Sequence, residues 1–200
     1  MEIKLFNFSN EIYNVKASYF SKSKTEQNVL LLPGAGYSCM GPVFYYIRNL
    51  CLDKKFNVIN IEYDFRFYPL KEDSKEANKD FIDFIVNKLD LEGFKQFDLI
   101  IAKSVGTKLL ALSKLSAKKY IWLTPSLKDI YVRNTIEKQN SKSLIAIDDK
   151  DPLFEESMVN SFLHVHIIKD AGHSLDTEGM PLKSIDALKD IIKKIDGFIS

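Results

Sequence analysis

The stretch FDLIIAKSVGTKLLAL, residues 97–112, decides the fold. Its first half is a short apolar run, which is typical of a strand buried on both faces of a sheet. Its second half has the apolar spacing of a helix, which we expect to continue through Leu115. Strand and helix therefore meet within one or two residues at Ser104, which predicts a sharp turn with a hydroxyl group at its corner.

On both sides of this stretch, apolar runs that predict strands alternate with segments of helical length. The expected strands are 29–32, 58–61, 120–124, 144–147 and 165–168, and the expected helices are 41–52, one capped by Ser74, 127–138 and one from Pro181. This alternation predicts an α/β fold with a mostly parallel sheet and helices on both faces. Residues 2–8 and 12–20 alternate apolar and polar side chains around a turn, which predicts an N-terminal antiparallel hairpin at an edge of the sheet.

The composition indicates a globular chain of balanced charge. Of the 200 residues, 46% are hydrophobic and 28% are charged, and the formal net charge is +1. A chain of this length usually forms one domain, so we expect a single domain over residues 1–200. The balanced charge predicts no nucleic-acid or membrane partner. We interpret the basic cluster Lys114, Lys118 and Lys119 as the solvated end of a helix.

Localisation signals are not expected in this chain. Glu2 and Lys4 interrupt the segment in which a signal peptide carries its apolar core, and no apolar run approaches the roughly 18 residues of a membrane helix. Cys39 and Cys51 lie close together in the sequence and do not suggest an oxidising compartment. We therefore expect a cytoplasmic protein.

The residues that follow each apolar run are the functional candidates, because open parallel sheets bind ligands beyond the carboxyl ends of their strands. Ser104 lies between Ala102 and Gly106, and a strained turn needs small residues there because strand and helix approach closely. The pattern resembles the G-x-S-x-G nucleophile elbow of the α/β-hydrolase family, with Ala102 in place of the first glycine. The alternative is that Ser104 only caps the helix.

A nucleophilic serine needs a base, and histidine has a suitable pKa. The chain has three histidines, of which His164 and His166 lie in or beside the last strand and are interpreted as structural, since they lack further metal ligands. His173 follows this strand in a loop of small residues, where an imidazole can reach across the strand ends. The pair Gly172-His173 resembles the catalytic-histidine loop of the same family.

The third member of a serine-hydrolase triad is a carboxylate that orients the imidazole. Asp148, Asp149 and Asp151 all follow the strand 144–147. In the family the acid lies a few residues past this strand, often before a proline, and Asp151 matches that position, while Asp148 and Asp149 remain alternatives. The order Ser104, Asp151, His173 is also the order of the family.

The resemblance implies an α/β-hydrolase fold and hydrolysis of a small ester or thioester through an acyl-enzyme on Ser104, with no metal or organic cofactor. It also implies that the backbone N–H groups of Ala35 and Val105 form an oxyanion hole. The connection 125–143 has room for one helix, so we expect no cap domain and short-acyl substrates. Tyr37, Phe65 and Trp122 are candidates for lining a pocket, and the oligomeric state is left open.

Two other functions are compatible with parts of the sequence. Gly34 and Gly36 after a buried strand, with Glu62 after the next parallel strand, could begin a dinucleotide-binding fingerprint. The third glycine of that fingerprint would fall at Cys39, and this hypothesis leaves the triad residues unexplained. A hydrolase-shaped binding protein without catalysis is the second alternative, because fold does not imply function.

Overall fold

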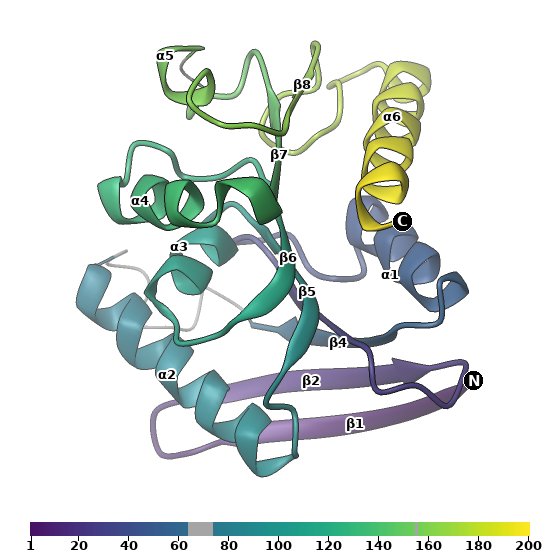
Figure 1. Ribbon diagram of the computed structural model, residues 1–200, viewed down its shortest axis with the longest axis vertical. Helices are drawn as coiled ribbons and strands as arrows, with labels where there is room; N and C mark the ends of the chain where they lie inside the picture. The colour runs from purple at the N-terminus through teal and green to yellow at the C-terminus, as the bar shows by residue number, and fades with distance from the viewer. Residues whose placement is uncertain (64–73, 155) are drawn as a thin grey trace.

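The computed structural model describes residues 1–63, 74–154 and 156–200, which build an eight-stranded sheet in the order β1-β2-β4-β3-β5-β6-β7-β8 (Figure 1). The strands are β1 (Glu2–Ser9), β2 (Asn14–Ser21), β3 (Asn28–Leu32), β4 (Asn57–Glu62), β5 (Phe97–Lys103), β6 (Ala117–Leu123), β7 (Ser143–Asp148) and β8 (Val165–Ile168). Neighbouring strands from β4 to β8 are parallel, whereas β1 and β2 form an antiparallel hairpin whose second strand pairs with β4. The predicted α/β fold with its edge hairpin is confirmed.

Helices cover both faces of the sheet. They are α1 (Pro42–Asp53), α2 (Lys75–Leu91), α3 (Val105–Leu112), α4 (Ile130–Lys138), the short α5 (Glu156–Val159) and α6 (Pro181–Ile199). Figure 1 shows α1 and α6 on one side of the sheet and α2, α3 and α4 on the other. Apolar residues of α1 and α6 share one core with the sheet, and those of α2, α3 and α4 share the other. Because both faces are buried, the central strands carry the continuous apolar runs seen in the sequence.

Side chains alternate along β5 between these two cores. Ile100 and Ala102 belong to the core under α2, α3 and α4, whereas Leu99 and Ile101 belong to the core under α1 and α6. By this alternation Lys103, the last residue of β5, points to the face of α1 and α6.

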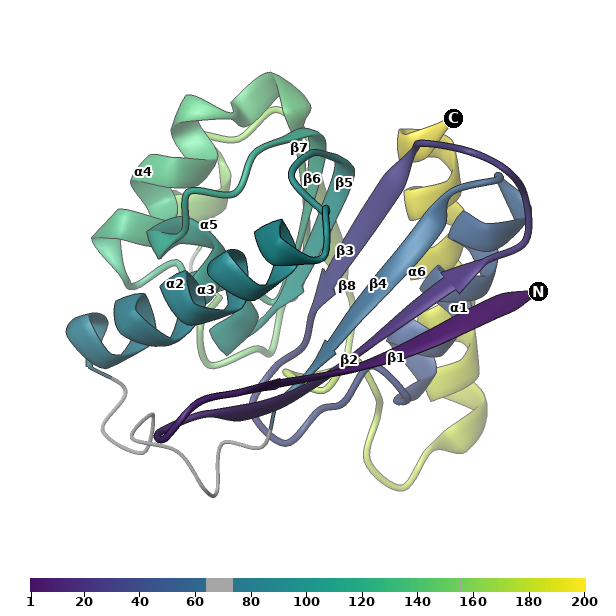
Figure 2. The ribbon, with the colours of Figure 1, turned by 90° about the horizontal axis from the view of Figure 1, so that it is seen from below.

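The hairpin lies at one edge of the sheet, and Figure 2 shows β1 and β2 running side by side beyond β4. Phe8 and Val15 are paired across the two strands and buried, while Leu5 is exposed. One face of the hairpin therefore packs on the core and the other faces solvent, which explains the alternation of apolar and polar residues in the sequence.

The helix after Ser104 ends at Leu112, earlier than predicted. The hydroxyl of Ser113 donates to the carbonyl of Leu110 (2.8 Å) and accepts the N–H of Leu115 (3.2 Å), so it turns the chain out of the helix. Serine offers the backbone such local alternatives to helical bonding.

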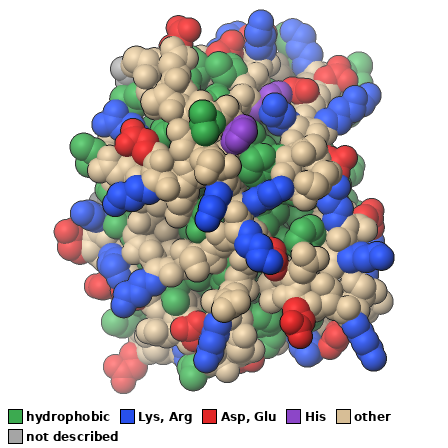
Figure 3. Space-filling model, in the orientation of Figure 1, with side chains coloured by type: hydrophobic (Ala, Val, Ile, Leu, Met, Phe, Trp, Pro, Cys, Tyr) green, Lys and Arg blue, Asp and Glu red, His purple; other side chains and the backbone are tan. Residues whose placement is uncertain are grey.

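The interpretation of the basic cluster as a helix end was therefore wrong, because Lys114 already lies beyond the end of α3. Lys118 and Lys119 lie in β6, where Lys118 pairs with Asp98 (2.7 Å) and Lys119 Nζ donates to the carbonyl of Phe198 (2.6 Å). On the face shown in Figure 3, basic and acidic side chains are interspersed, as the balanced composition predicts.

The connection between β6 and β7 holds α4 and a short 3-10 helix (Asn140–Lys142). Leu127, Val132 and Ile136 are buried, whereas Ile130 at the start of α4 is exposed. In the part of the chain that the structure describes, no cap domain covers the strand ends, as predicted.

No helix within the described ranges is both long and apolar enough to cross a membrane. Cys39 and Cys51 are free thiols, and both are buried.

Candidate active site

Ser104 occupies a strained turn between β5 and α3. Its backbone has φ 51° and ψ −119°, a region that residues with a side chain rarely adopt. The hydroxyl makes no capping hydrogen bond to α3, and Oγ instead lies 2.8 Å from Nε2 of His173. The geometry therefore does not favour the alternative in which Ser104 only caps the helix.

Glycines make this turn possible, because three backbone segments meet there. A Cβ atom on Gly106 would lie 2.4 Å from the carbonyl oxygen of Leu32 and 2.7 Å from that of Pro33, both closer than real contacts allow. A Cβ atom on Gly34 would lie 3.1 Å from Cβ of Ser104. The loop after β3 is thus packed directly against the Ser104 turn.

His173 joins Ser104 to Asp151. Its Nε2 faces the Ser104 hydroxyl, and its Nδ1 lies 2.8 Å from Oδ2 of Asp151, whose side chain is fully buried. An ionised carboxylate only accepts hydrogen bonds, so Nδ1 carries the proton and Nε2 is left to accept the proton of the Ser104 hydroxyl. The His173 side chain is 37% exposed, so the imidazole is not sealed from solvent as the Asp151 carboxylate is.

The three aspartates after β7 have different partners. Asp151 Oδ1 accepts the N–H of Leu153 (2.8 Å) while its Oδ2 faces the imidazole. Asp148 is also buried, but its carboxylate accepts the N–H groups of Lys150 and Ala171. Asp149 accepts the N–H of Asp170 (3.3 Å). Of the three, only Asp151 contacts the imidazole.

The two N–H groups expected to form an oxyanion hole border the Ser104 turn. Val105 is the first residue of α3, where backbone N–H groups have no intrahelical acceptor. Ala35 is exposed in the loop after β3, and neither N–H donates to another described residue. The hydroxyl of Tyr63 donates to the carbonyl of Pro33 and so anchors this loop.

The other two histidines lie away from this arrangement. His164 is exposed with its ring near Phe198, and Nε2 of His166 lies 2.8 Å from Asp190. Among the described residues, no group of three or more His, Cys, Asp or Glu side chains is arranged to hold a metal ion.

The residues of the dinucleotide hypothesis are placed differently from a phosphate-binding turn. The helix after β3 begins at Pro42, so a long loop separates it from Gly34 and Gly36, whereas the fingerprint needs the helix to start at the glycines. Glu62 lies beside the buried Cys39 thiol, and burial raises the pKa of the Glu62 carboxyl. This arrangement does not present Glu62 to a ribose.

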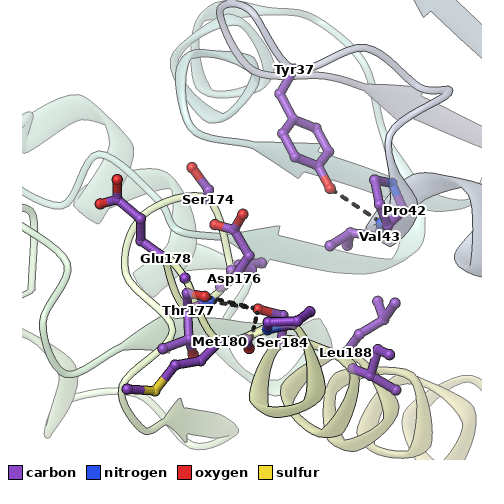
Figure 4. A pocket seen from close by; sticks show the side chains of 14 residues that line it. Tyr37, Pro42, Val43, Ser174, Asp176, Thr177, Glu178, Met180, Ser184 and Leu188 are labelled. Atoms are coloured by element: carbon purple, nitrogen blue, oxygen red, sulfur yellow. Dashed lines mark hydrogen bonds between the residues drawn. The ribbon is translucent and has the colours of Figure 1, made fainter.

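A cavity of about 500 Å³ lies between the start of α1, the loop after β8 and the start of α6 (Figure 4). Tyr37 and Val43 line one side of it, and Asp176, Glu178 and Leu188 line the other. Ser174, the neighbour of His173 in the loop after β8, is one of its lining residues, whereas Ser104, Asp151 and His173 are not.

Of the aromatic residues considered as pocket lining, Tyr37 lines this cavity. Trp122 is a core residue instead, since it is fully buried and its indole N–H donates to Ser143 Oγ (3.1 Å). Phe65 lies outside the described residues.

Comparison with solved structures shows an α/β-hydrolase fold. A predicted CIB-like hydrolase from Thermoplasma acidophilum aligns with a TM-score of 0.71 at 13% identity, over 98% of this chain and 99% of that one. The esterase domain of a Rhodothermus marinus protein aligns over the whole of both chains, with a TM-score of 0.67 at 11% identity. A dienelactone hydrolase from Anabaena variabilis has a TM-score of 0.63 at 13% identity, over 98% and 96%.

The sequence itself matches no protein-family model and no curated protein. At the identities above, structural likeness establishes the fold alone. The chain therefore has the α/β-hydrolase fold expected from the sequence. Its activity depends on the residues of its own site, because a fold does not specify a function.

Sequence reasoning gave no role to Lys103, which the structure places under the His173 loop. The signal was present in the sequence, because a lysine that ends a strand of otherwise apolar residues has to leave its charge either in solvent or against a partner. Only the three-dimensional structure identifies that partner, which is the main-chain oxygen of His173.

Proposed function

We propose that this protein is a serine hydrolase that cleaves small esters or thioesters through an acyl-enzyme on Ser104. The observation that carries the proposal is the chain of two 2.8 Å hydrogen bonds from Ser104 through His173 to the buried Asp151. These three side chains come from three separate connections that follow strands of the sheet. A hydroxyl group that is hydrogen-bonded to an imidazole, which is in turn hydrogen-bonded to a carboxylate, is activated as a nucleophile at neutral pH.

In the proposed mechanism, Nε2 of His173 takes the hydroxyl proton as Ser104 Oγ attacks the substrate carbonyl carbon. Asp151 stabilises the imidazolium that forms, and the N–H groups of Ala35 and Val105 stabilise the negative oxygen of the tetrahedral intermediate. His173 then gives its proton to the leaving alcohol or thiol, which leaves the acyl group on Ser104. A water molecule, deprotonated by His173, hydrolyses this acyl-enzyme and releases the acid.

The preference for small substrates rests on the surroundings of Ser104. The described residues provide no cap over the strand ends, so little apolar surface is available to cover a long acyl chain. The cavity that reaches Ser174, next to His173, combines apolar side chains such as Val43 and Leu188 with polar ones, and it offers room for part of a small substrate.

A fluorophosphonate probe followed by peptide mass spectrometry tests the proposal. We expect the label on Ser104, and we expect Ser104→Ala to lose the label and at least about 10³-fold in kcat/KM on short-chain esters while remaining folded. Ser74 is the matched control, since it caps α2 through a hydrogen bond to the N–H of Ala77 (3.1 Å). Ser74→Ala is expected to lower stability by about 1 kcal/mol and to leave turnover unchanged.

Turnover retained by Ser104→Ala would overturn the assignment of the nucleophile. A folded wild-type protein that neither takes the label nor hydrolyses any member of a panel of esters, thioesters and amides would indicate the non-catalytic binding protein instead.

A further inference from the structure

Lys103 is the neighbour of Ser104 and is only 2% exposed. Lysine is rarely buried so completely, because an ammonium group taken out of water needs polar partners to replace its hydration. None of the carboxylates among the described residues forms an ion pair with it. Neutral polar groups and an aromatic ring must therefore stabilise the ammonium charge.

Each contact of the Lys103 ammonium belongs to a different loop. Nζ donates to the main-chain oxygen of His173 (2.7 Å) and to Oγ1 of Thr124 (3.3 Å), and it lies 4.9 Å from the centre of the Tyr37 ring. These residues follow β8, β6 and β3, respectively. The ammonium thus joins the loop of the proposed base to the loop that precedes α1 and to the end of β6.

The contact at His173 matters because the surrounding loop has an unusual backbone. Asp170, Gly172 and Leu175 all have positive φ, which residues with a side chain such as Asp170 and Leu175 rarely adopt, so the hydrogen bonds that hold this backbone are important for its conformation. The carboxylate of Asp148 holds one side of it at the N–H of Ala171. Lys103 holds the other side at the carbonyl of the residue that carries the imidazole.

We propose that Lys103 is a positioning residue for the proposed base: its charged ammonium clamps the main chain of His173 so that Nε2 stays within hydrogen-bond reach of Ser104. This inference rests on the proposed function. A displacement of about 1 Å in a catalytic group lowers turnover strongly, so loss of the clamp acts on the chemical step rather than on substrate binding.

The clamp also predicts an alkaline limit on activity. Burial lowers the pKa of Lys103 to about 8, and the charges of Asp151 and Asp176 oppose this shift. The other titratable group facing it is Tyr37, whose pKa burial raises, so the phenol stays neutral in this range. Above pH 8 the ammonium becomes an amine, which is a weaker donor to the His173 carbonyl.

The loss of activity at alkaline pH can be distinguished from unfolding, because titration of Lys103 changes activity and stability in opposite directions. The pKa of Lys103 is lower in the folded protein than the ordinary value of 10.5, so on raising the pH the folded state releases this proton before the unfolded state does. Between the folded-state pKa of about 8 and the ordinary value of 10.5, the contribution of Lys103 to the free energy of unfolding therefore increases with pH. Activity is therefore expected to fall while this group makes the fold more stable.

Lys103→Met tests the clamp, with Lys108→Met as the matched control. Lys108 is also largely buried, but its ammonium pairs with Asp129 (3.2 Å), the residue before α4, whereas the main-chain oxygen of His173 accepts from Lys103. We expect Lys103→Met to lower kcat roughly 10- to 100-fold with KM changed less than about threefold. It should also lose the alkaline decline centred near pH 8. Lys108→Met should keep the wild-type kcat and pH profile.

Hydrogen exchange supplies a readout that does not depend on turnover. Faster exchange of the amides of residues 171–175 in Lys103→Met, but not in Lys108→Met, supports the clamp. Unchanged exchange there, or a wild-type kcat and pH profile in Lys103→Met, overturns it. If the fluorophosphonate labels Ser104 while Lys103→Met behaves as wild type, the clamp fails and the proposed function stands. If the probe does not label the wild type, the proposed function fails, and exchange still decides whether Lys103 holds the loop.

Discussion

The turn that carries Ser104 and the loops that carry Asp151 and His173 meet in one hydrogen-bonded chain, but they are held in different ways. The turn depends on backbone geometry: Ser104 has positive φ, and Gly106 lies where any side chain would strike the carbonyls of β3 and the loop after it. The loops depend on polar side chains, with Asp148 holding the N–H of Ala171 and Lys103 holding the carbonyl of His173.

This difference separates two ways of damaging the site. A side chain added at Gly106 in the Ser104 turn acts through steric overlap and should reduce stability and turnover together. A substitution among the polar side chains changes a hydrogen bond or a charge, and its effect depends on whether the bond ends on the imidazole or on the backbone. Stability and turnover measured on the same variants therefore distinguish the two regions.

The largest effect is expected at Asp151. Asp151→Asn keeps the size of the side chain but removes the charge that holds Nδ1 protonated, so kcat is expected to fall by about 10⁴-fold while the unfolding free energy changes less. The measurement is kcat and chemical denaturation of the same preparations.

Asp148→Asn is the matched variant, because Asp148 is equally buried but holds backbone N–H groups. It is expected to lose about 1–3 kcal/mol of stability, with a smaller loss of turnover than Asp151→Asn. Asp149→Asn should affect turnover least of the three. If Asp148→Asn or Asp149→Asn abolished turnover in folded protein while Asp151→Asn did not, Asp151 would not be the acid.

An intermediate effect is expected at Gly106. Gly106→Ala places a methyl group against the backbone of β3 and the following loop, and overpacking of this kind costs about 1–3 kcal/mol of stability. Turnover should fall with it, because the displaced loop carries Ala35. Thermal unfolding and kcat/KM check both expectations.

Gly197 in α6 provides the control, since a Cβ atom there has no neighbour within 4 Å. Gly197→Ala should raise stability by about 0.5–1 kcal/mol, because alanine is the better helix former, and should leave turnover unchanged. A Gly106→Ala protein as stable and active as the wild type would show that the close approach at the turn is not required.

The smallest effect is expected from the acyl length of the substrate. With no cap among the described residues, a long chain gains little contact, so short-chain p-nitrophenyl esters should be preferred by roughly tenfold or less. Rates are compared below and above the solubility limit of the long-chain ester. A sharp rise when an oil interface forms, together with a preference for long chains, would reveal a mobile cover and contradict the expectation for residues 125–143.

The sequence alone predicted the features that depend on local pattern. The apolar run before Ser104, the small residues around it and the alternation of strands and helices all follow from side-chain periodicity and backbone sterics, which act over a few residues. The order of elements then placed Ser104, Asp151 and His173 at the same edge of a parallel sheet, because the carboxyl ends of parallel strands lie together.

Tertiary structure decided the features that depend on which polar groups meet. Three aspartates after β7 have the same chemistry, and only the packing of the loop after β8 places the imidazole against Asp151 and the N–H of Ala171 against Asp148. In the same way, Lys103 is recognisable in the sequence as a lysine that ends an apolar strand, but its partner at His173 lies 70 residues away. A buried charge is held by whichever distant groups the fold brings to it, and no local pattern specifies them.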